Sequence, residues 1–260
     1  MWPLERKLDV LRVGRVHAEY WSRAPDGLVL QARHSLGAQP GEPKTLEVGL
    51  RNWLLGLESA SSRANPVDVV VESAWLPIML IEVGRSKWRG DHMERLLRHR
   101  TTELHLQPGA TTEDWSLQLD HRQGEPQALG YALAPETQRA LVGAVLAAGR
   151  RPASLQPALA WARRRFERRE RRLRTCWWIW CEQDRAIVCR MERGRVTAMN
   201  AGAAVPGDEA QHARLVAIEA ARCGFTEVGE PVVLASWEKL AALREEDPAR
   251  PAPRALRATT

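Results

Sequence analysis

The sequence predicts a mixed α/β fold built as two similar lobes. Short β-rich runs alternate with helical patterns along the chain, and the series of strands followed by a helix begins again after a long basic helical segment. The chain has 260 residues, of which 44% are hydrophobic, so it can bury the core of one large or two small domains.

The first lobe is predicted to open with a hairpin. Apolar and polar residues alternate within residues 8–30, and the turn signal Pro25-Asp26-Gly27 divides them. A helix is predicted over 44–57, because apolar residues recur at helical spacing at Leu46, Leu50, Trp53, Leu54 and Leu57.

The middle of the chain alternates strands and helices. The expected elements are strands over 67–72 and 76–83, a helix over 92–103, a short strand over 104–106, strands over 115–119 and 127–133, and a helix from Pro135 to Ala148. Pro135 suits the first turn of that last helix, and Gly149 suits the position just past its end.

A long helix is predicted over 155–173, where apolar residues stand at spacings of 4, 3, 4 and 7: Leu155, Leu159, Ala162, Phe166 and Leu173. Residues 176–181 read CWWIWC, without a polar face, which favours a central strand covered on both sides. Its tryptophans are therefore expected in the core.

The second lobe continues with strands over 186–191 and 195–199, a helix from Asp208 to Cys223, a strand over 231–235 and a helix over 237–244. Asp208 with Gln211 forms a capping box at the start of the first of these helices. The proline-rich end of the chain is expected to be disordered. The predicted domains are thus a first lobe over 1–152, a linking helix with the second lobe over 153–245, and a tail over 246–260.

The basic excess of the chain lies in one segment. The chain carries 38 Lys+Arg against 32 Asp+Glu, a formal net charge of +6. Residues 163–174 hold eight Arg and two Glu, so this segment accounts for the whole net charge. The arginines leave one apolar stripe that needs a protein surface, while the other faces could contact anionic lipid, an acidic partner or nucleic acid, or simply be solvated.

Patterns that carry chemistry are sparse. A basic loop over 84–90, with Arg85 and Lys87, could hold an anion at a helix N-terminus or could be an exposed loop. The 4 Cys form no C-x2-C pair and are expected to be small buried residues, and His92 and His99 are expected on a solvated helix face. No Walker loop, dinucleotide fingerprint or G-x-S-x-G nucleophile motif occurs, so no catalytic, cofactor-binding or metal-binding residue is predicted.

The sequence also limits the location of the protein. Four Cys are too few for a disulfide scaffold, the first residues lack the layout of a secretory signal, and no apolar run approaches the roughly 20 residues of a membrane helix. We therefore expect a cytoplasmic protein, peripheral on the inner membrane if it works at a membrane.

Three stretches resemble a known family: 67–83 (VDVVVESAWLPIMLIEV), 153–166 (ASLQPALAWARRRF) and 175–196 (TCWWIWCEQDRAIVCRMERGRV). They are similar to the PilM-like proteins of type IV pilus assembly and to the cytoplasmic part of the type II secretion protein GspL. The resemblance implies a two-lobed actin-like (ribonuclease H-like) fold with mixed sheets, in which a strand such as Ser154-Leu155-Gln156-Pro157 leads into a helix linking the lobes.

The chain departs from the family at the phosphate loops. Nucleotide-binding members of this fold carry Asp-x-Gly-Thr/Ser at the first hairpin of each lobe. This chain has Val13-Gly14-Arg15-Val16-His17 at the first position and Glu182-Gln183-Asp184-Arg185-Ala186 at the second. Arg185 replaces the glycine turn, and its side chain would crowd a phosphate, so no family ATP site is carried over.

The resemblance therefore implies a degenerate, non-catalytic member: a cytoplasmic scaffold of a pilus or secretion-type machine. Its expected partner is the cytoplasmic tail of a single-pass inner-membrane protein, and an anionic membrane surface is a second expected contact. The alternatives are a divergent ATPase of the same fold, which would bind ATP with Mg²⁺, and nucleic-acid binding through the helix over 163–174. The partner- or anion-binding candidates are Arg163, Arg164, Arg168, Arg171 and Arg172, together with Arg85 and Lys87.

Overall fold

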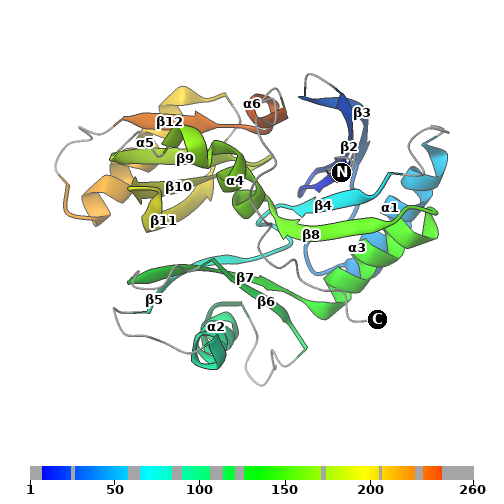
Figure 1. Cartoon of the computed structure of the whole chain (residues 1–260), viewed down its shortest axis with the longest axis horizontal. Helices are drawn as coiled ribbons and strands as arrows, with labels where there is room; N and C mark the ends of the chain where they lie inside the picture. Colours follow the sequence, from blue (N-terminus) through cyan, green and yellow to red (C-terminus); the bar gives the residue numbers. More distant parts are fainter. Residues whose placement is uncertain are drawn as a thin grey trace, which may run out of the picture.

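Three β-sheets and the helices around them form the molecule (Figure 1). The structure is a computed structural model of the chain, and it describes residues 8–24, 27–57, 65–83, 90–105, 114–120, 126–170, 174–204, 207–225 and 231–241. A five-stranded sheet lies in one lobe, a four-stranded sheet in the other, and a three-stranded sheet lies below both in this view.

The five-stranded sheet has the order β3-β2-β1-β4-β8 and consists of β3 (Gly27–Ser35), β2 (His17–Ala24), β1 (Asp9–Val13), β4 (Val67–Val71) and β8 (Pro152–Pro157). The pairs β1–β2 and β2–β3 are antiparallel, whereas β4 is parallel to both β1 and β8. Helices α1 (Pro43–Gly56) and α3 (Pro135–Ala147) pack side by side on this sheet (Figure 1). Leu46, Leu50 and Leu54 of α1 are buried, as their helical spacing predicts.

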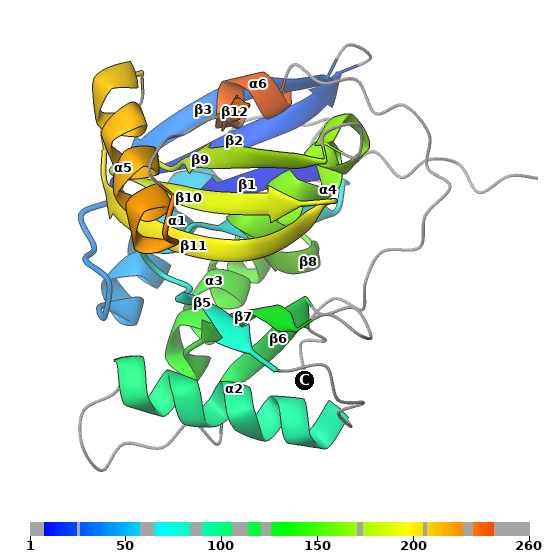
Figure 2. The same cartoon turned by 90° about the vertical axis from the view of Figure 1, so that its left-hand side faces the viewer.

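The three-stranded sheet is inserted between β4 and α3 in the sequence. It has the order β5-β7-β6, with β5 (Ile78–Glu82), β7 (Gln127–Leu133) and β6 (Ser116–Asp120), and all its pairings are antiparallel. Helix α2 (Gly90–His105) covers one face of this sheet (Figure 2). Met93 and Leu97 of α2 pack with Met79 and Ile81 in an apolar cluster separate from the main core.

The four-stranded sheet has the order β11-β10-β9-β12 and consists of β11 (Arg195–Ala203), β10 (Arg185–Glu192), β9 (Thr175–Cys181) and β12 (Val232–Ala235). Helix α5 (Glu209–Arg222) covers one face (Figure 2). Its N-cap is confirmed, because the Asp208 side chain accepts a hydrogen bond from the Gln211 N–H at 3.0 Å. Helices α4 (Ala158–Glu170) and α6 (Trp237–Ala241) pack against each other.

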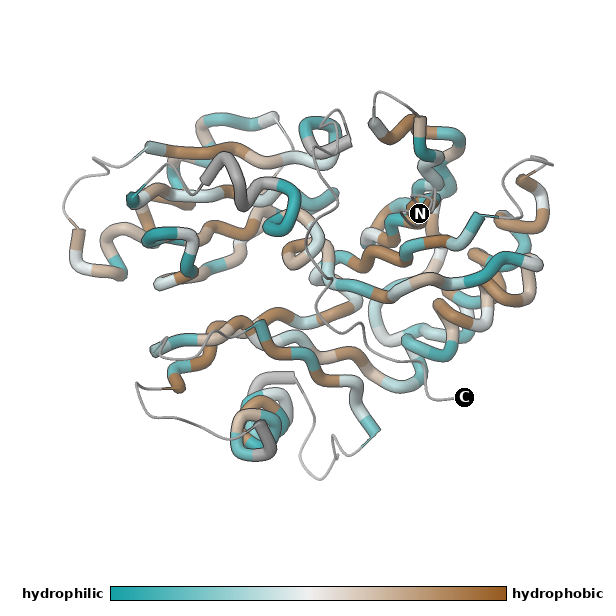
Figure 3. The backbone as a smooth tube through the Cα atoms, viewed as in Figure 1, coloured by the Kyte–Doolittle hydropathy of each residue, from teal (hydrophilic) through white to brown (hydrophobic). Residues whose placement is uncertain are grey.

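β9 is the central strand that its apolar sequence predicts. Trp178 and Trp180 face the main core, whereas Trp177 and Ile179 face α5, so both faces of the strand are covered. In Figure 3 the apolar residues follow the strands of all three sheets. The prediction that these tryptophans form core rather than a binding surface is confirmed.

Four local predictions need correction. Residues 155–157 belong to β8 and not to a long helix, because Leu155 pairs with Val69 in the parallel ladder, and α4 begins only at Ala158. Residues 104 and 105 are the end of α2 rather than a strand. The opening hairpin contains three strands, since the chain also turns between β1 and β2. β11 extends to Ala203, beyond the predicted end at residue 199.

Several predicted features lie outside the described residues. They are the centre of the basic loop with Arg85 and Lys87, the end of the basic segment with Arg171 and Arg172, and the tail over 246–260. The division between lobes at residue 152/153 stays a prediction, although β8, which contains this position, pairs with β4 in the five-stranded sheet. Among the helices of the described residues, none has the length and apolar character of a membrane span.

Candidate functional site at the junction of two hairpins

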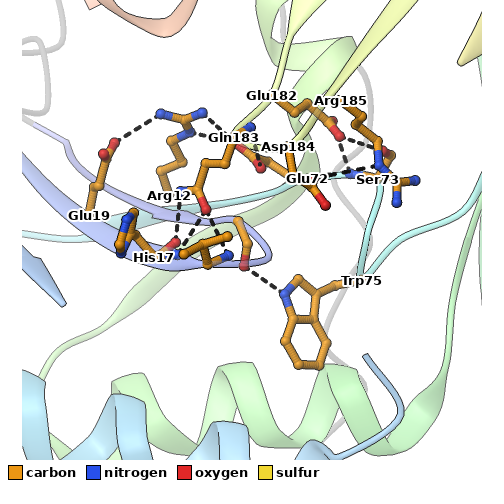
Figure 4. Close-up of polar contacts among 12 residues, drawn as sticks. Arg12, His17, Glu19, Glu72, Ser73, Trp75, Glu182, Gln183, Asp184 and Arg185 are labelled. Atoms are coloured by element: carbon orange, nitrogen blue, oxygen red, sulfur yellow. Dashed lines mark hydrogen bonds and ion pairs between the residues drawn. The ribbon is translucent and has the colours of Figure 1, made fainter. Parts of the chain in front are cut away.

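The turn between β1 and β2 lies against the turn between β9 and β10, although about 170 residues separate them (Figure 4). The first turn is closed by a hydrogen bond from the Gly14 N–H to the His17 carbonyl oxygen at 3.0 Å. The second is closed by a bond from the Glu182 N–H to the Arg185 carbonyl oxygen at 2.9 Å. We call the contact between these two turns, together with the end of β4, the hairpin junction.

Gln183 is the central side chain of the hairpin junction. Its Oε1 accepts hydrogen bonds from the Val16 N–H at 2.9 Å and the His17 N–H at 2.8 Å. Its Nε2 donates to the His17 carbonyl oxygen at 2.9 Å. The Val16 and His17 amide N–H groups of the first turn therefore already have an acceptor in the second lobe.

Two further contacts flank Gln183. Arg15 Nη1 lies 2.9 Å from Asp184 Oδ2 in a partly exposed ion pair. Ser73, just after β4, donates its N–H to Glu182 Oε1 at 2.9 Å, and its hydroxyl group is hydrogen-bonded to Glu182 Oε2. The contacts across the junction thus join one lobe to the other through side chains of the chain itself.

A buried ionic cluster lies behind the junction. Arg12 Nη1 lies 3.0 Å from Glu19 Oε2, and Arg12 Nε donates to Glu72 Oε1 at 2.7 Å. The Arg12 guanidinium also lies 5.0 Å from the ring centroid of Trp237, which comes from the second lobe. Because Glu72 in turn accepts a long hydrogen bond from the Gln183 N–H, at 3.4 Å, the cluster is continuous with the junction.

Several carboxyl groups meet at this point of the molecule, and arginines pair with most of them: Arg12 with Glu19 and Glu72, and Arg15 and Arg185 with Asp184. Glu72 and Glu182 are fully buried, and Asp184 lies next to them in the turn. Burial first, and then the nearby charge of Glu72, raise the pKa of Glu182 to about 8. Glu182 is therefore largely protonated at neutral pH, although the two bonds that Ser73 donates to it act in the opposite direction.

The arginines of α4 have separate roles. Arg163 is not presented to solvent: its side chain is 15% exposed, pairs with Asp120 of β6 and donates to the Gly194 carbonyl oxygen at 3.3 Å. Arg165 stacks on Trp161, with its guanidinium 4.1 Å from the ring centroid. Arg164 is exposed. The backbone of Arg168 lies in α4, but the structure does not describe the Arg168 side chain.

Another group of arginines extends the basic region. The β10–β11 turn brings exposed Arg193 and Arg195 to the start of β9, where the Arg193 N–H donates to the carbonyl oxygen of exposed Arg174 at 2.7 Å. Arg193 has a φ of 51°, so the turn holds a non-glycine residue in the left-handed region. We call Arg174, Arg193 and Arg195 the arginine surface. Arg193 and Arg195 lie far from the basic segment in sequence, which is why the charge count missed them.

Candidate metal and nucleophile chemistry is limited. In the described part of the chain there is no group of three or more His, Cys, Asp and Glu side chains that could hold a metal ion. Cys176, Cys181 and Cys189 are buried as predicted, and burial raises the pKa of the Cys181 thiol to about 11. The prediction is wrong for Cys223, which is exposed. His92 and His99 are exposed on α2, as predicted.

Comparison with known proteins shows the fold. No protein-family model matches the sequence, and no curated protein is similar to it in sequence. A protein of unknown function with an actin-like ATPase fold from Bacteroides thetaiotaomicron has a TM-score of 0.57 at 12% identity, over 91% of this chain and 86% of that one.

Two further structures are similar over most of their length. One is the PilM-PilN type IV pilus biogenesis complex, with a TM-score of 0.54 and 17% identity over 84% of this chain and 69% of that one. The other is the cytoplasmic domain of EpsL, an inner-membrane component of the type II secretion system of Vibrio cholerae, with a TM-score of 0.53 and 13% identity over 88% of this chain and 81% of that one. The chain therefore has a two-lobed actin-like fold with mixed sheets, as predicted.

Proposed function

We propose that this protein is a non-catalytic assembly factor of a pilus or secretion-type machine, and that it binds the cytoplasmic tail of a single-pass inner-membrane protein. The observation that carries the proposal is the fold, which is similar over at least 84% of the chain to PilM in its complex with PilN and to the cytoplasmic domain of EpsL. In this proposal the protein is cytoplasmic and peripheral on the inner membrane.

The hairpin junction supports the non-catalytic part of the proposal. Phosphate binding in this fold needs free backbone amides and room at the first hairpin of each lobe. Here the Val16 and His17 amides are bonded to Gln183, and a Cβ atom at Gly14 would lie only 2.3 Å from Gln183 Cδ, so the side chain fills the turn closely. The residues present do not fit a nucleotide, and we propose that none is bound.

The arginine surface supports a contact with an anionic membrane or an acidic partner. Exposed arginines attract anionic lipid headgroups with about 1 kcal/mol each close to a membrane. In the described residues Arg174, Arg193 and Arg195 are exposed in or next to the contact between the β10–β11 turn and the start of β9, and the Gly194 carbonyl oxygen of this turn accepts a hydrogen bond from Arg163 of α4. Arg163 is excluded from this role, because it is paired with Asp120.

The partner proposal is tested by fractionation and interaction mapping in cells that contain the natural partner genes. We expect the full chain to sediment with the inner membrane, and to bind the cytoplasmic tail of a single-pass protein encoded nearby in a two-hybrid assay. Binding to none of the tails encoded beside this gene, with a soluble distribution in cells, would contradict the proposal.

The surface is tested with a triple variant, Arg174→Gln, Arg193→Gln and Arg195→Gln. Its matched control neutralises three exposed arginines elsewhere on the molecule, on α2, α3 and α5: Arg100, Arg139 and Arg214. We expect the first variant, and not the control, to lose membrane association while both keep the Tm of the wild type. If both variants kept the membrane association of the wild type, the arginine surface would be only a solvated face.

The two alternatives predict different measurements. An ATPase would gain stability with Mg·ATP, by about 2.7 kcal/mol at a ligand concentration of 100 times Kd, whereas we expect no change in Tm. A nucleic-acid-binding protein would bind arbitrary duplexes with an affinity that falls steeply as salt is raised. We expect no such binding, because most of the chain is formally neutral and Arg163 and Arg165 have partners within the fold.

A further inference from the structure

We propose that Gln183 is an internal ligand that locks the two lobes together: its carboxamide occupies the place between them that a phosphate would need, and so the chain itself sets the lobe arrangement. This inference concerns the isolated chain and does not depend on which partner it binds. It is carried by the contacts of one side chain with the backbone of the opposite lobe.

The hydrogen bonds of Gln183 match both sides of the first turn. One oxygen accepts from two successive N–H groups, of Val16 and His17, and the amide nitrogen donates to the carbonyl group of His17 (Figure 4). All three bonds cross between the lobes. A side chain that satisfies two donors and one acceptor of the same turn acts as a specific ligand of that turn.

Gly14 makes room for this ligand. A Cβ atom at Gly14 would lie 2.3 Å from Gln183 Cδ, 2.4 Å from Oε1 and 2.5 Å from Nε2, all far inside van der Waals contact. Gly14 is not among the glycines with positive φ, so the requirement at this position is for space rather than for an unusual backbone conformation. The glycine and the glutamine therefore fit as a pair.

The charges around the junction explain why a neutral side chain is suited to this place. The charges at the junction are already balanced: Asp184 pairs with Arg15 and Arg185, Glu72 pairs with Arg12, and Glu182 is largely protonated at neutral pH. A phosphate would add negative charge among these groups, whereas a carboxamide adds none. A carboxylate in place of the carboxamide would also face the His17 carbonyl oxygen without a proton to donate.

The flanking contacts make the lock cooperative. The Arg15–Asp184 ion pair lies on the exposed side of Gln183, and the Ser73–Glu182 bonds lie on its buried side. Opening of the lobes at the junction must break all of these contacts together with the three bonds of Gln183. The described geometry thus favours one closed arrangement without any bound nucleotide.

Hydrogen exchange of the full-length chain tests this inference. In the wild type we expect the Val16 and His17 amides to be protected. In Gln183→Ala their exchange should rise roughly tenfold or more, because each loses its acceptor, while the amides of β4 and β9 keep their protection. Gln211→Ala, which removes an exposed carboxamide of the same lobe, is the matched control and should leave Val16 and His17 unchanged.

A second variant reaches the same contact from the other side. Gly14→Ala leaves Gln183 in the chain but places a methyl group where its carboxamide lies, so it should raise the exchange of the same two amides. Unchanged protection in both variants would show that Gln183 does not hold the turn. Equal loss of protection in β4 and β9 would show that the lobes do not separate without unfolding, which also overturns the lock.

Nucleotide provides the last arm of the experiment. Adding Mg·ATP or inorganic phosphate to the wild type should leave the exchange of Val16 and His17 unchanged. Saturable protection or deprotection of these amides by either ligand would mean that the place is open to phosphate, and the inference would be wrong. None of these outcomes depends on the membrane partner, so the lock can fail while the assembly function stands.

Discussion

Glu182 is a carboxyl group that the fold holds in its protonated form. It is fully buried, it accepts the Ser73 N–H, and its second oxygen meets the Ser73 hydroxyl group. Burial and the neighbouring carboxylate of Glu72 raise its pKa to about 8 from 4.5. Glu182 therefore links the β9–β10 turn to the end of β4 by accepting both bonds from Ser73.

The pH dependence of stability follows from this shift. Between about pH 4.5 and about pH 8 the folded chain keeps a proton that the unfolded chain releases, so the free energy of unfolding falls as pH rises through this window. Glu182→Gln imitates the protonated acid and cannot titrate. We expect the variant to lose this part of the pH dependence and to be more stable than the wild type at about pH 9.

Urea unfolding across this pH range measures the effect. Glu136→Gln, at an exposed position on α3, is the control and should follow the wild-type curve. A Glu182→Gln curve parallel to that of the wild type would show that Glu182 is ionised throughout, contrary to the expectation.

At the residue scale the sequence reveals chemistry poorly. The resemblance pointed to residues 182–186 as a lost phosphate loop, but nothing in the pattern showed that Gln183 would reach the backbone of Val16 and His17. Likewise Arg12 stands in a β-rich run, and its burial between Glu19 and Glu72 is a product of tertiary pairing. Contacts between residues that are distant in sequence leave no local signal that a single sequence can show.

At the element scale, helices and strands with one clear apolar pattern were predictable. α1, α3 and α5 have regular apolar spacing or clear end signals, and β9 has an apolar run that only a central strand satisfies. The apolar spacing assigned residues 155–157 to a helix, because Leu155 stands four residues before Leu159, whereas the family resemblance implied a strand over 154–157, which the structure confirms. The parallel pairing of β8 with β4 makes these residues a strand.

The inserted sheet depends on close packing between β7 and α2. A Cβ atom at Gly130 of β7 would lie 2.4 Å from Leu97 Cδ1 and 2.9 Å from Ile81 Cδ1, within a tightly buried cluster. We expect Gly130→Val to destabilise this unit by about 1–3 kcal/mol through overpacking. This destabilisation should appear as faster hydrogen exchange of the β5 and β7 amides.

Gly37 supplies the matched control, because a Cβ atom there meets nothing within 4 Å. Gly37→Val should leave the exchange of β5 and β7 unchanged. In Gly130→Val the amides of the four-stranded sheet should stay protected, because the added methyl groups enter the cluster between the inserted sheet and α2, whereas Leu129 and Tyr131 on the opposite face of β7 pack in the main core. Loss of protection in both sheets would show that the inserted unit is not independent.

At the scale of the whole molecule, the two-lobed architecture followed from the order of elements, whereas the way the lobes and the inserted sheet are joined did not. The main apolar core runs through all three parts, with Val10 of the first lobe, Leu129 of the inserted sheet and Trp178 of the second lobe in one cluster, and two polar junctions add to it. One is the lock around Gln183, and the other is Arg163 of α4, which reaches Asp120 of β6 and the Gly194 carbonyl oxygen of the β10–β11 turn. Arg163, which was expected to contact an anionic partner, thus joins parts of the chain to one another.

The second junction can be measured by a double-mutant cycle with Arg163→Met and Asp120→Asn. Arg163 is largely buried while Asp120 is 40% exposed, so solvent weakens the pair, and we expect a coupling energy near the lower end of the range of about 0.5–3 kcal/mol for contacting residues. Arg163→Met should destabilise more than Asp120→Asn, since it also removes the bond to Gly194. A coupling energy close to zero would mean that the inserted sheet is joined to α4 by packing alone, and the Gln183 lock would then be the main polar link between distant parts of the chain.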